Sequence, residues 1–470
     1  MSDGKLFQTD YDRASCEIGI VHLGFGAFHR AHQAVYIDDY MQKTGDLRWG
    51  IAAVNLREAD AAGFHKAAQA KDGYVLKTIA PDGGVGYRMV RSHLAFIDAS
   101  SANDEGFDIL CRPSVHAVTI TVTESGYYVD KNWALDLSAE PIERGIAGDK
   151  TETVYAYLTE ALARRAKLLN TPLTIMCCDN IRNNGKMLER TLLSYITATG
   201  QEALALWVKN NVSFPCSMVD RITPRSTDDL NAEISQLFSA ETLSPVHAEL
   251  FTQWVIEKKF ASEMPELNKV DVQIVSDVRP YEEAKIRILN GGHTALAYLG
   301  VLSGHTTFDQ AMRDPHLRAH FDRWEKAEVL EGLDDNIPFD TAHYLGEIAQ
   351  RFENQGIADH LERICMDGYS KMAIYIRPTL EACLQKGIVP EAGFDCVASW
   401  IVNARRYQNG TSAIPYHEPY WDRMEPMIAP GNEEEIASDP HIWGDLPDRF
   451  NSFVPGLVAA IHRMEQKWQV

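Results

Sequence analysis

Short apolar runs alternate with stretches of helical spacing over the first 280 residues of the chain. The apolar runs fall at 18–23, 49–54, 115–123, 173–178 and 270–278, and helical spacing occurs at 59–70, 150–167 and 186–197. Strands that alternate with helices are typical of a parallel sheet covered by helices. Two further runs, 74–79 and 87–97, flank Pro81-Asp82-Gly83-Gly84 and predict a hairpin-like pair inserted into that pattern.

After Pro280 the strand signals thin out and helical spacing predominates. It runs through 285–300, 341–355, 357–367, 379–386, 396–407 and 453–468. A chain of 470 residues exceeds the usual size of a single hydrophobic core, so two large domains are expected. We predict an α/β fold with a doubly wound, Rossmann-type NAD-binding domain with insertions over 1–279, followed by a largely α-helical substrate and catalytic domain over 280–470.

The first apolar run leads directly into a glycine turn and then into a helical pattern that reaches about Gln42. In such a unit, Gly24 permits a tight turn and Gly26 lets the backbone approach a pyrophosphate. His29 stands where the third glycine of G-x-G-x-x-G is expected, and Arg30 supplies a positive charge for a phosphate. The predicted cofactor contacts are Gly24, Gly26, Phe28, His29 and Arg30. Alternatively, His29 is only part of a polar helix start.

The end of the second apolar run predicts where the adenosine ribose lies. In doubly wound sheets a carboxylate at this place accepts hydrogen bonds from the ribose hydroxyls. Glu58 and Asp60 are the candidates, and both are equally suited to cap the following helix. Because Arg57 lies beside them, NAD is favoured as cofactor while NADP stays open.

The segment 280–293 combines an ammonium, an amide and an imidazole at helical spacing. With about 100° per residue, Lys285, Asn290 and His293 share one broad, half-apolar arc. Burial lowers the pKa of a lysine, so Lys285 can act as a base, His293 can relay its proton, and Asn290 can donate to an oxygen that gains negative charge. The alternative is a structural helix with a snorkelling lysine and a core histidine. Gly291 and Gly292 each weaken that helix by about 1 kcal/mol, which suggests a need for close backbone approach.

Composition argues against several kinds of partner. The formal net charge of −21 and the pI of about 5.2 argue against a nucleic acid. No apolar run approaches the roughly 18 residues of a membrane span, and the first residues lack a signal-peptide pattern, so a cytoplasmic protein without a membrane partner is expected. The eight cysteines show no C-x-x-C spacing, so we expect no metal site. The expected partner is a small molecule, and the expected state is a monomer or weak homo-oligomer.

The chain resembles the mannitol dehydrogenase family, the long-chain polyol-specific dehydrogenases. The motifs that carry the resemblance are GFGAFHRAHQA at 24–34, TVTESGYY at 121–128, CDN at 178–180, SMVDRITP at 217–224 and PYEEAKIRILNGGH at 280–293. The resemblance covers nearly the whole chain. It implies a metal-independent, NAD-dependent oxidoreductase that reversibly oxidises a secondary hydroxyl of a sugar alcohol.

The resemblance also implies roles for individual residues. Lys285 would be the general base, and Glu282 would serve its proton path to solvent. Asn180 and Asn290 would form an amide pair that holds the developing alkoxide, and His293 would position substrate and base. Distal substrate hydroxyls would be bound by Asp220, Arg363 and Lys371. Without the family resemblance, these three residues have structural interpretations. Asp220 would form an ion pair with Arg221, and Arg363 and Lys371 would belong to a solvated helix face.

Within the family, the sequence leaves the substrate open. Segments 73–78, 281–290 and 378–383 are most similar to the D-arabinitol 4-dehydrogenase branch, whereas 178–182 and 214–216 occur equally in reductases of fructuronate or tagaturonate. Lys258 and Lys259 depart from the family pattern and are either surface charges or ligands for a carboxylate. We expect a polyol of the D-arabinitol or D-mannitol type, with a hexuronate reductase as the alternative. A non-catalytic dinucleotide-binding sensor is a third class, against which the intact Lys285 counts.

Overall fold

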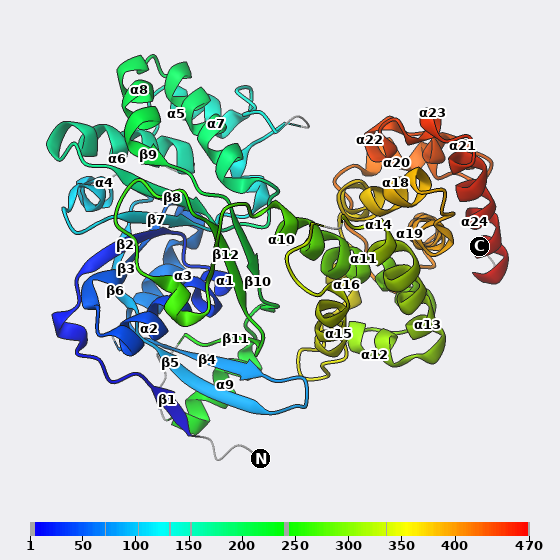
Figure 1. The fold of residues 1–470 in the computed structure, drawn as a ribbon, viewed down its shortest axis with the longest axis horizontal. Coiled ribbons are helices and arrows are strands. Elements are labelled where there is room, and N and C mark those ends of the chain that lie inside the picture. Colours follow the sequence, from blue (N-terminus) through cyan, green and yellow to red (C-terminus); the bar gives the residue numbers. More distant parts are fainter. Residues whose placement is uncertain are drawn as a thin grey trace. The chain divides into compact units, whose positions relative to one another are not determined.

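The computed structural model describes residues 5–70, 72–101, 103–130, 133–150, 153–238, 244–334 and 336–468. The chain divides into two compact units. The first unit comprises the residues up to Ala80 together with Gly84–Arg279, and the second comprises Pro81–Gly83 and the residues from Pro280 on. Figure 1 colours the first unit from blue to green and most of the second from green to red.

A six-stranded parallel sheet forms the centre of the first unit. Its strand order is β6 (His93–Asp98), β3 (Gly50–Asn55), β2 (Ile18–Leu23), β7 (Ala117–Ile120), β8 (Leu173–Cys177) and β9 (Val212–Ser213). The chain proceeds outward from β2 in one direction and then returns to build the other half from β7. The strand order therefore reverses between β2 and β7, which is where doubly wound sheets bind ligands. The predicted α/β fold is confirmed.

Helices cover both faces of this sheet, and the alternation of side chains along β2 shows why. Val21 and Leu23 pack in one core with α6 (Val154–Leu168) and α7 (Asn184–Ala198). Ile20 belongs to another core with α2 (Gln33–Thr44) on the opposite face. A strand buried on both faces must be apolar throughout, which accounts for the continuous hydrophobic runs of the sequence. The remaining helices of this unit are α1 (Ala27–Ala31), α3 (Glu58–Ala68), α4 (Asp104–Asp108), α5 (Glu140–Ile146), α8 (Glu202–Asn211) and α9 (Asp228–Phe238).

The predicted hairpin is present, but its second half divides between two sheets. β4 (Tyr74–Ile79) and β5 (Val85–Val90) pair antiparallel in a sheet of order β1 (Leu6–Gln8), β5, β4, β11 (Val246–Glu249). The run 87–97 is therefore not one strand. After Val90 the chain leaves this sheet, and the carbonyl of Ser92 accepts from the N–H of Ile51, so that β6 begins beside β3 in the central sheet.

A third sheet holds β10 (Ser217–Asp220), β12 (Gln253–Glu257) and β13 (Gln273–Val275). The predicted strand 270–278 is shorter in the structure. Residues 267–270 form a 3₁₀ turn, Asp271 has a left-handed backbone with φ of 67°, and the helix α10 (Arg279–Ala284) begins soon after β13. The left-handed residue interrupts the extended backbone that a longer strand requires.

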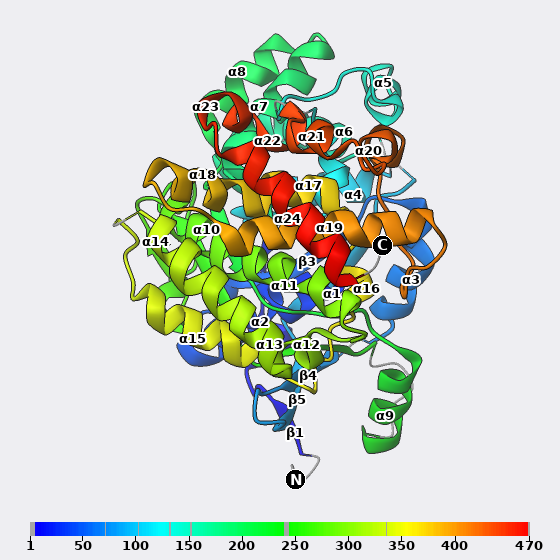
Figure 2. The same ribbon diagram turned by 90° about the vertical axis from the view of Figure 1, so that its right-hand side faces the viewer.

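The second unit is helical, as predicted. Its most buried helix is α11 (Gly291–Leu302), which packs against α19 (Glu391–Gln408), and α24 (Phe453–Trp468) crosses over α19 (Figure 2). α11 is apolar all round because neighbouring helices cover it on every side. Other helices are α12 (Phe308–Arg313), α13 (Pro315–Arg323), α14 (Leu330–Gly332), α15 (Thr341–Phe352), α16 (Leu361–Ile364), α17 (Gly368–Lys371), α18 (Arg377–Gln385), α20 (Trp421–Met427), α21 (Glu433–Ala437), α22 (Pro440–Trp443) and α23 (Leu446–Arg449).

The second unit departs from the predicted helices in two ways. Of the predicted helix 357–367, only α16 is helical, and Ala358 with φ of 45° interrupts the pattern. Within the described residues, three segments are π-helical rather than α-helical: η6 (Lys285–Asn290), η7 (Trp324–Val329) and η8 (Met372–Ile376). Segment η6 packs against both of the others. The α-helical angles that we used for 285–293 therefore do not hold.

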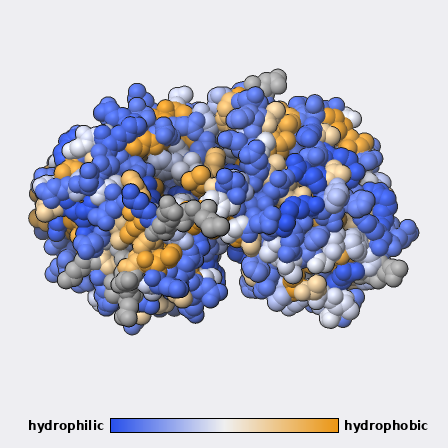
Figure 3. Space-filling model, turned by 90° about the horizontal axis from the view of Figure 1, so that it is seen from below, coloured by the Kyte–Doolittle hydropathy of each residue, from blue (hydrophilic) through white to orange (hydrophobic). Residues whose placement is uncertain are grey.

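The face of the molecule in Figure 3 is mostly hydrophilic, with separate hydrophobic patches. Among the described residues, no helix has both the length and the apolar character needed to traverse a bilayer.

Candidate active site

A cavity of about 670 Å³ opens in the first unit where β2, β3 and β7 end. This position at the carboxyl ends of the strands, beside the switch point, is where doubly wound sheets bind nucleotides. Its walls come from the glycine turn, the start of α3, the turn after β7 and the α9 region. They are formed by Gly24, Phe25, Gly26, Arg30, Asn55, Leu56, Arg57, Asp60, Gly63, Phe64, Lys66, Ala67, Thr121, Val122, Thr123, Ser226, Asp228, Asn231, Ile234, Ser235, Ser244 and Pro245.

The two glycines of the turn meet different requirements. Gly24 has φ of +108°, and a Cβ there would lie 2.7 Å from the carbonyl oxygen of Thr121. No other residue type fits without strain. A Cβ on Gly26 would meet nothing within 4 Å, so this glycine leaves the cavity wall open to a ligand's close approach.

Arg30 is a half-buried cation of the cavity wall. Its guanidinium donates to the carbonyl oxygen of Ser244 over 2.7 Å and lies 5.0 Å from the centre of the Phe25 ring. Burial lowers the pKa of Arg30 to about 10, so the side chain is still charged at neutral pH. A fixed positive charge in a partly enclosed cavity suits a phosphate group.

Of the other predicted cofactor residues, one lines the cavity and three do not. Asp60 lines the cavity, where its carboxylate lies 3.7 Å from the guanidinium of Arg57. Glu58 and Phe28 are absent from the cavity wall. His29 is fully buried below the turn, where its ring stacks on His22 at 3.3 Å between ring centres. Its Nε2 lies 2.9 Å from Nε2 of His93, so the structure places His29 in the core beneath the site.

Helix α9 forms a wall of the cavity that the sequence analysis missed. Leu230 and Ile234 pack on Val75 and Met89 of the hairpin, which holds α9 in place. Its polar residues Asn231 and Ser235 line the cavity, with Ser226 and Asp228 just before them. The hairpin insertion thus positions a polar wall opposite the start of α3. No local sequence signal pointed to this, because α9 follows the glycine turn by about two hundred residues.

Two of the predicted substrate residues also belong to the first unit. Asn180 is exposed in the turn that directly follows β8. Asp220 is buried at the end of β10. Its neighbour Arg221 donates to the backbone carbonyls of Glu249, at 3.0 Å, and of Ala31. Arg221 is therefore used to tie three segments of the first unit together.

In the second unit, the π-helical segment η6 carries Lys285 at its start and Asn290 at its end. A π-helix closes its hydrogen bonds between residues five apart, so these two residues lie one above the other on one face. Lys285 is buried, with 6% of its surface exposed. The buried Oδ1 of Asn290 finds no hydrogen-bond partner in the described part of the chain, which is unusual for a side-chain amide.

His293 follows on α11 in an aromatic and acidic surrounding. Its ring stacks on Phe352 and meets the edge of Phe308, at 5.0 and 4.2 Å between ring centres. Burial lowers the pKa of His293 to about 3, and the nearby carboxylate of Asp359 only partly opposes this, so the imidazole is neutral at physiological pH. Its Nε2 lies 3.9 Å from Oδ2 of Asp359.

Asp359 links His293 to Arg363, another of the predicted substrate residues. The guanidinium of Arg363 donates to both oxygens of Asp359, with Nε at 2.9 Å from Oδ1. Asp359 is buried, whereas the Arg363 side chain is 55% exposed, so its donors on the outer side stay accessible. The sequence analysis did not single out Asp359, and its pair with Arg363 is not a helical one, because Asp359 lies before the start of α16.

Lys371 and Glu282 complete the predicted set. The ammonium of Lys371 donates to the carbonyl oxygen of Ile364 over 2.7 Å, and burial lowers the pKa of this lysine. Its charge also acts on His293, as does that of Arg363. Glu282 is buried in α10, three residues before Lys285.

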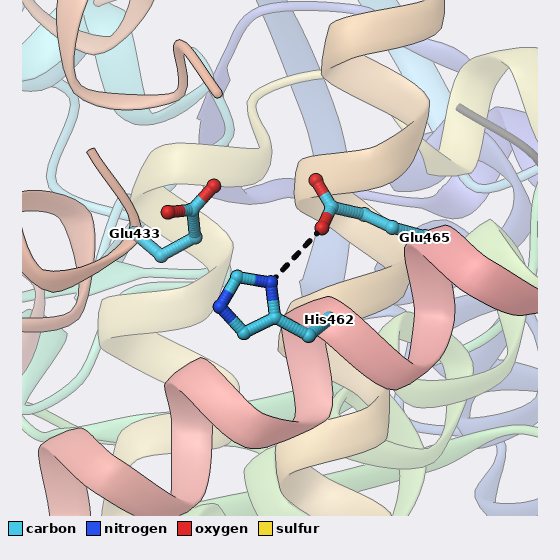
Figure 4. Close-up of side chains that lie close together, drawn as sticks. All are labelled: Glu433, His462 and Glu465. Carbon is cyan, nitrogen blue, oxygen red and sulfur yellow. Dashed lines mark hydrogen bonds and ion pairs between the residues drawn. The ribbon is translucent and has the colours of Figure 1, made fainter. Parts of the chain in front are cut away.

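A separate cluster near the C-terminus joins Glu433, His462 and Glu465 (Figure 4). His462 Nδ1 lies 3.2 Å from Oε2 of Glu465. Arg405, with 1% of its side chain exposed, donates to Glu433 over 2.7 Å and forms an ion pair with Glu465. The arginine therefore already supplies the positive charge that a metal ion would bring, and we interpret this cluster as a structural ion-pair network.

The fold and the cavity are those of a Rossmann-type nucleotide-binding protein. A family model described as the mannitol dehydrogenase Rossmann domain matches residues 18–269, and one described as the mannitol dehydrogenase C-terminal domain matches 277–464. The chain belongs to the mannitol dehydrogenase family, and the predicted resemblance is confirmed. It is thus an enzyme, a dehydrogenase with a Rossmann domain followed by a helical domain.

Individual relatives match over nearly the whole length. D-arabinitol 4-dehydrogenase from Klebsiella pneumoniae is 34% identical over 94% of this chain and 98% of its own. A mannitol dehydrogenase of Saccharomyces cerevisiae is 36% identical over 92% of this chain and 85% of its own. The structure of Pseudomonas fluorescens mannitol 2-dehydrogenase in a ternary complex with NAD and D-mannitol has a TM-score of 0.86 and 31% identity, covering 99% of this chain and 94% of that chain.

Proposed function

We propose that the protein reversibly oxidises a secondary hydroxyl of a sugar alcohol, of the D-arabinitol or D-mannitol type, to the ketose, with NAD as the oxidant and without a metal ion. The observation that carries this proposal is a buried lysine, Lys285, that shares one face of a π-helical segment with Asn290. Two relatives named for such substrates, and a third solved with NAD and D-mannitol, support the substrate class and the cofactor.

The cavity of the first unit fits a dinucleotide. Gly26 leaves room for a pyrophosphate, Arg30 supplies a half-buried positive charge for it, and Asp60 offers a carboxylate to ribose hydroxyls. When bound, NAD supplies an acceptor for the hydride of the carbinol carbon. The base, the proton path and the hydrogen-bond donors of the reaction are side chains of this protein.

Lys285 takes the proton of the substrate hydroxyl. A buried ammonium is harder to keep charged than an exposed one, so burial favours the neutral amine that a base must be. Glu282 lies one helical turn away and is also buried, which suits it to pass the proton on toward solvent. In ketose reduction the same residues transfer the proton in the opposite direction.

Asn290 and Asn180 donate from their amide NH2 groups to the oxygen that becomes an alkoxide. Amide donors held in place stabilise developing negative charge as a zinc ion does in other alcohol dehydrogenases. His293 is neutral and therefore binds and orients the hydroxyl through a hydrogen bond rather than through charge. Asp220, Arg363 and Lys371 bind the distal hydroxyls, for which a polyol requires both donors and acceptors.

The hexuronate alternative receives less support. It would need a cation for the substrate carboxylate, and Lys258, Lys259 and Arg363 are the candidates. Both lysines are exposed, and Lys259 lies 3.8 Å from the carboxylate of Glu189. The two surface lysines, one of them already near an acid, give no built carboxylate site. Arg363 has accessible donors that suit a carboxylate as well as hydroxyls, so the named relatives are what favours the polyol.

The test is NADH formation with D-arabinitol, D-mannitol, D-sorbitol, xylitol, D-mannonate and D-altronate, with NADP in parallel and after dialysis against EDTA. We expect oxidation of polyols that EDTA does not reduce. Lys285→Ala should lose on the order of 10² or more in rate at neutral pH. Lys326→Ala is the matched control, because that lysine is 64% exposed on η7. Oxidation confined to the hexonates, or full activity of Lys285→Ala, would contradict the proposal.

A further inference from the structure

Asp179 lies in the turn after β8, directly before Asn180, and gathers donors from a distant segment. Its carboxylate accepts from the backbone N–H of Val122 at 2.9 Å and of Thr123 at 3.2 Å. It also accepts from the hydroxyl of Tyr127 at 2.7 Å. An ionised carboxylate has acceptor positions for all three of these donors and presents no proton to any of them.

The segment that Asp179 holds is part of the cofactor cavity and is strained. Thr121, Val122 and Thr123 form the cavity wall after β7. Thr123 has φ of 67° and ψ of 161°, a region that residues other than glycine scarcely occupy. Such a conformation persists only where surrounding contacts enforce it, and the two N–H groups bound by Asp179 belong to Thr123 itself and to the residue before it.

The main chain of Asp179 fixes the opposite side of the same turn. Its carbonyl oxygen accepts from the N–H of Ile181 at 2.9 Å and from Nδ2 of Asn184 at 3.2 Å. The Oδ1 of Asn184 in turn accepts from the N–H of Ser217 at 2.9 Å. Asn180 is therefore placed at the corner of a turn that is held from both ends, with Asp179 as the shared residue.

We propose that Asp179 is a positioning residue, whose carboxylate holds the strained Val122–Thr123 turn in the shape that binds the cofactor while its main chain fixes Asn180 beside it. This rests on the proposed NAD-dependent function, since it assigns the 122–123 turn to cofactor binding. It predicts that cofactor affinity depends on the charge of one carboxylate that never touches the substrate.

The surroundings of Asp179 give this dependence a definite pH. Burial raises the pKa of Asp179 to about 6, with the hydrogen bonds from Tyr127 and Val122 opposing the rise. The titratable groups that face it are Glu124, Tyr127, Cys177 and Cys178. The carboxylate is thus ionised at pH 7, and it gains a proton as the pH falls through about 6. A protonated Asp179 has lost an acceptor and releases the turn.

The negative charge of Asp179 does not add to the stability of the folded chain. The pKa is raised from its ordinary 3.8 to about 6, so the folded protein binds the proton more tightly than the unfolded chain does. The free energy of unfolding therefore falls as the pH rises through that window.

The experiment is a titration of the full chain with NADH from pH 5 to 8, followed by fluorescence, which requires no proton transfer by Lys285. We expect the dissociation constant to rise about tenfold between pH 7 and pH 5 as Asp179 is protonated. Asp179→Asn should bind NADH about tenfold more weakly at pH 7, with a flat profile below it. Asp136→Asn is the control, because that carboxylate only caps its own turn through Ser138 and should leave affinity and profile unchanged.

A second variant separates positioning from a merely structural role. Tyr127→Phe removes a donor that lowers the pKa of Asp179, so the midpoint of the NADH profile should move up by about one pH unit. An unmoved midpoint, or an Asp179→Asn profile like that of the unaltered protein, would overturn the proposal alone. Absence of NADH binding at every pH would instead overturn the proposed function, and this inference with it.

Discussion

The carboxyl group of Glu325 fills the space that a side chain on Gly292 would need. A Cβ built on Gly292 would lie well inside 3.0 Å of Oε1 of Glu325, with the ring of Phe321 at 3.0 Å on the other side. Glu325 is fully buried on η7, and neither carboxyl oxygen has a hydrogen-bond partner among the described residues. Burial raises the pKa of Glu325 well above its ordinary value, and the charge of Arg287 opposes this only in part. The glycine makes room for that acid directly before His293.

Gly292→Ala should therefore destabilise the protein by about 1–3 kcal/mol, the usual cost of overpacking. Glu325→Ala in the same chain should recover most of this loss, because it removes the atoms that the new methyl group meets. Urea unfolding of the single and double variants measures the coupling directly. Gly346→Ala is the control, since nothing lies within 4 Å of its Cβ position in α15, and it should be neutral or slightly stabilising. Additive effects of the two substitutions would show that the contact does not exist.

Asp60 should determine the choice between NAD and NADP. Its carboxylate faces the cavity and would repel a ribose phosphate, while Arg57 at 3.7 Å and Lys66 stay to bind one. Asp60→Ala should raise the ratio of kcat/KM for NADP over NAD by about tenfold, which corresponds to about 1.4 kcal/mol. Glu58→Ala, two residues away but outside the cavity wall, should leave the ratio unchanged. An equal response of both variants would remove Asp60 from the ribose site.

Asp359 should act on substrate affinity through Arg363. It accepts from both donor nitrogens of that arginine and lies 3.9 Å from His293, so Asp359→Asn loosens two proposed substrate contacts at once. We expect KM for the polyol to rise about tenfold with a smaller change in kcat, since the chemical step at Lys285 is untouched. Asp322→Asn is the matched control, because Asp322 pairs with Arg318 four residues away on a partly exposed helix face. A fall in kcat with constant KM would contradict this.

Arg405 should be essential to the stability of the C-terminal helices. It is 1% exposed and pairs with Glu433 of α21 and Glu465 of α24. Arg405→Met leaves these acids without their cation and should cost about 3–5 kcal/mol in urea unfolding, less at pH 5 than at pH 8 because protonated acids need no partner. Arg463→Met, which breaks a pair with Asp395 from a 57% exposed side chain, should cost less than about 1 kcal/mol. Equal losses for the two would exclude the buried network.

The periodicity of the sequence was sufficient to predict the class of fold and the place of the cavity. Strand, glycine turn and helix are local patterns, and Gly24, Gly26, Arg30 and Asp60 are found in the cavity wall because the turn after the first strand always lies at the same edge of a parallel sheet. The change to helical spacing after Pro280 likewise predicted a helical second unit. These features depend on neighbours within one turn or strand.

Contacts between distant segments were decided by the tertiary structure alone. His29 was predicted at the cofactor, yet its ring is buried against His22 and His93, because the helix that carries it faces the sheet with that side. Helix α9, the clamp from Asp179 to the 122–123 turn and the link from Asp359 to His293 each join residues far apart in the chain.

The π-helical shape of residues 285–290 was likewise decided by the tertiary structure. Its sequence is compatible with an α-helix, and it packs against two other π-helical segments that the chain supplies some forty and ninety residues later. Hydrophobic spacing along the chain thus determined which elements form and in what order. Burial against partners that are remote in sequence decided which side chains face the cavity, which are neutral and which are strained, because desolvation and packing act on the assembled core and not on any one segment.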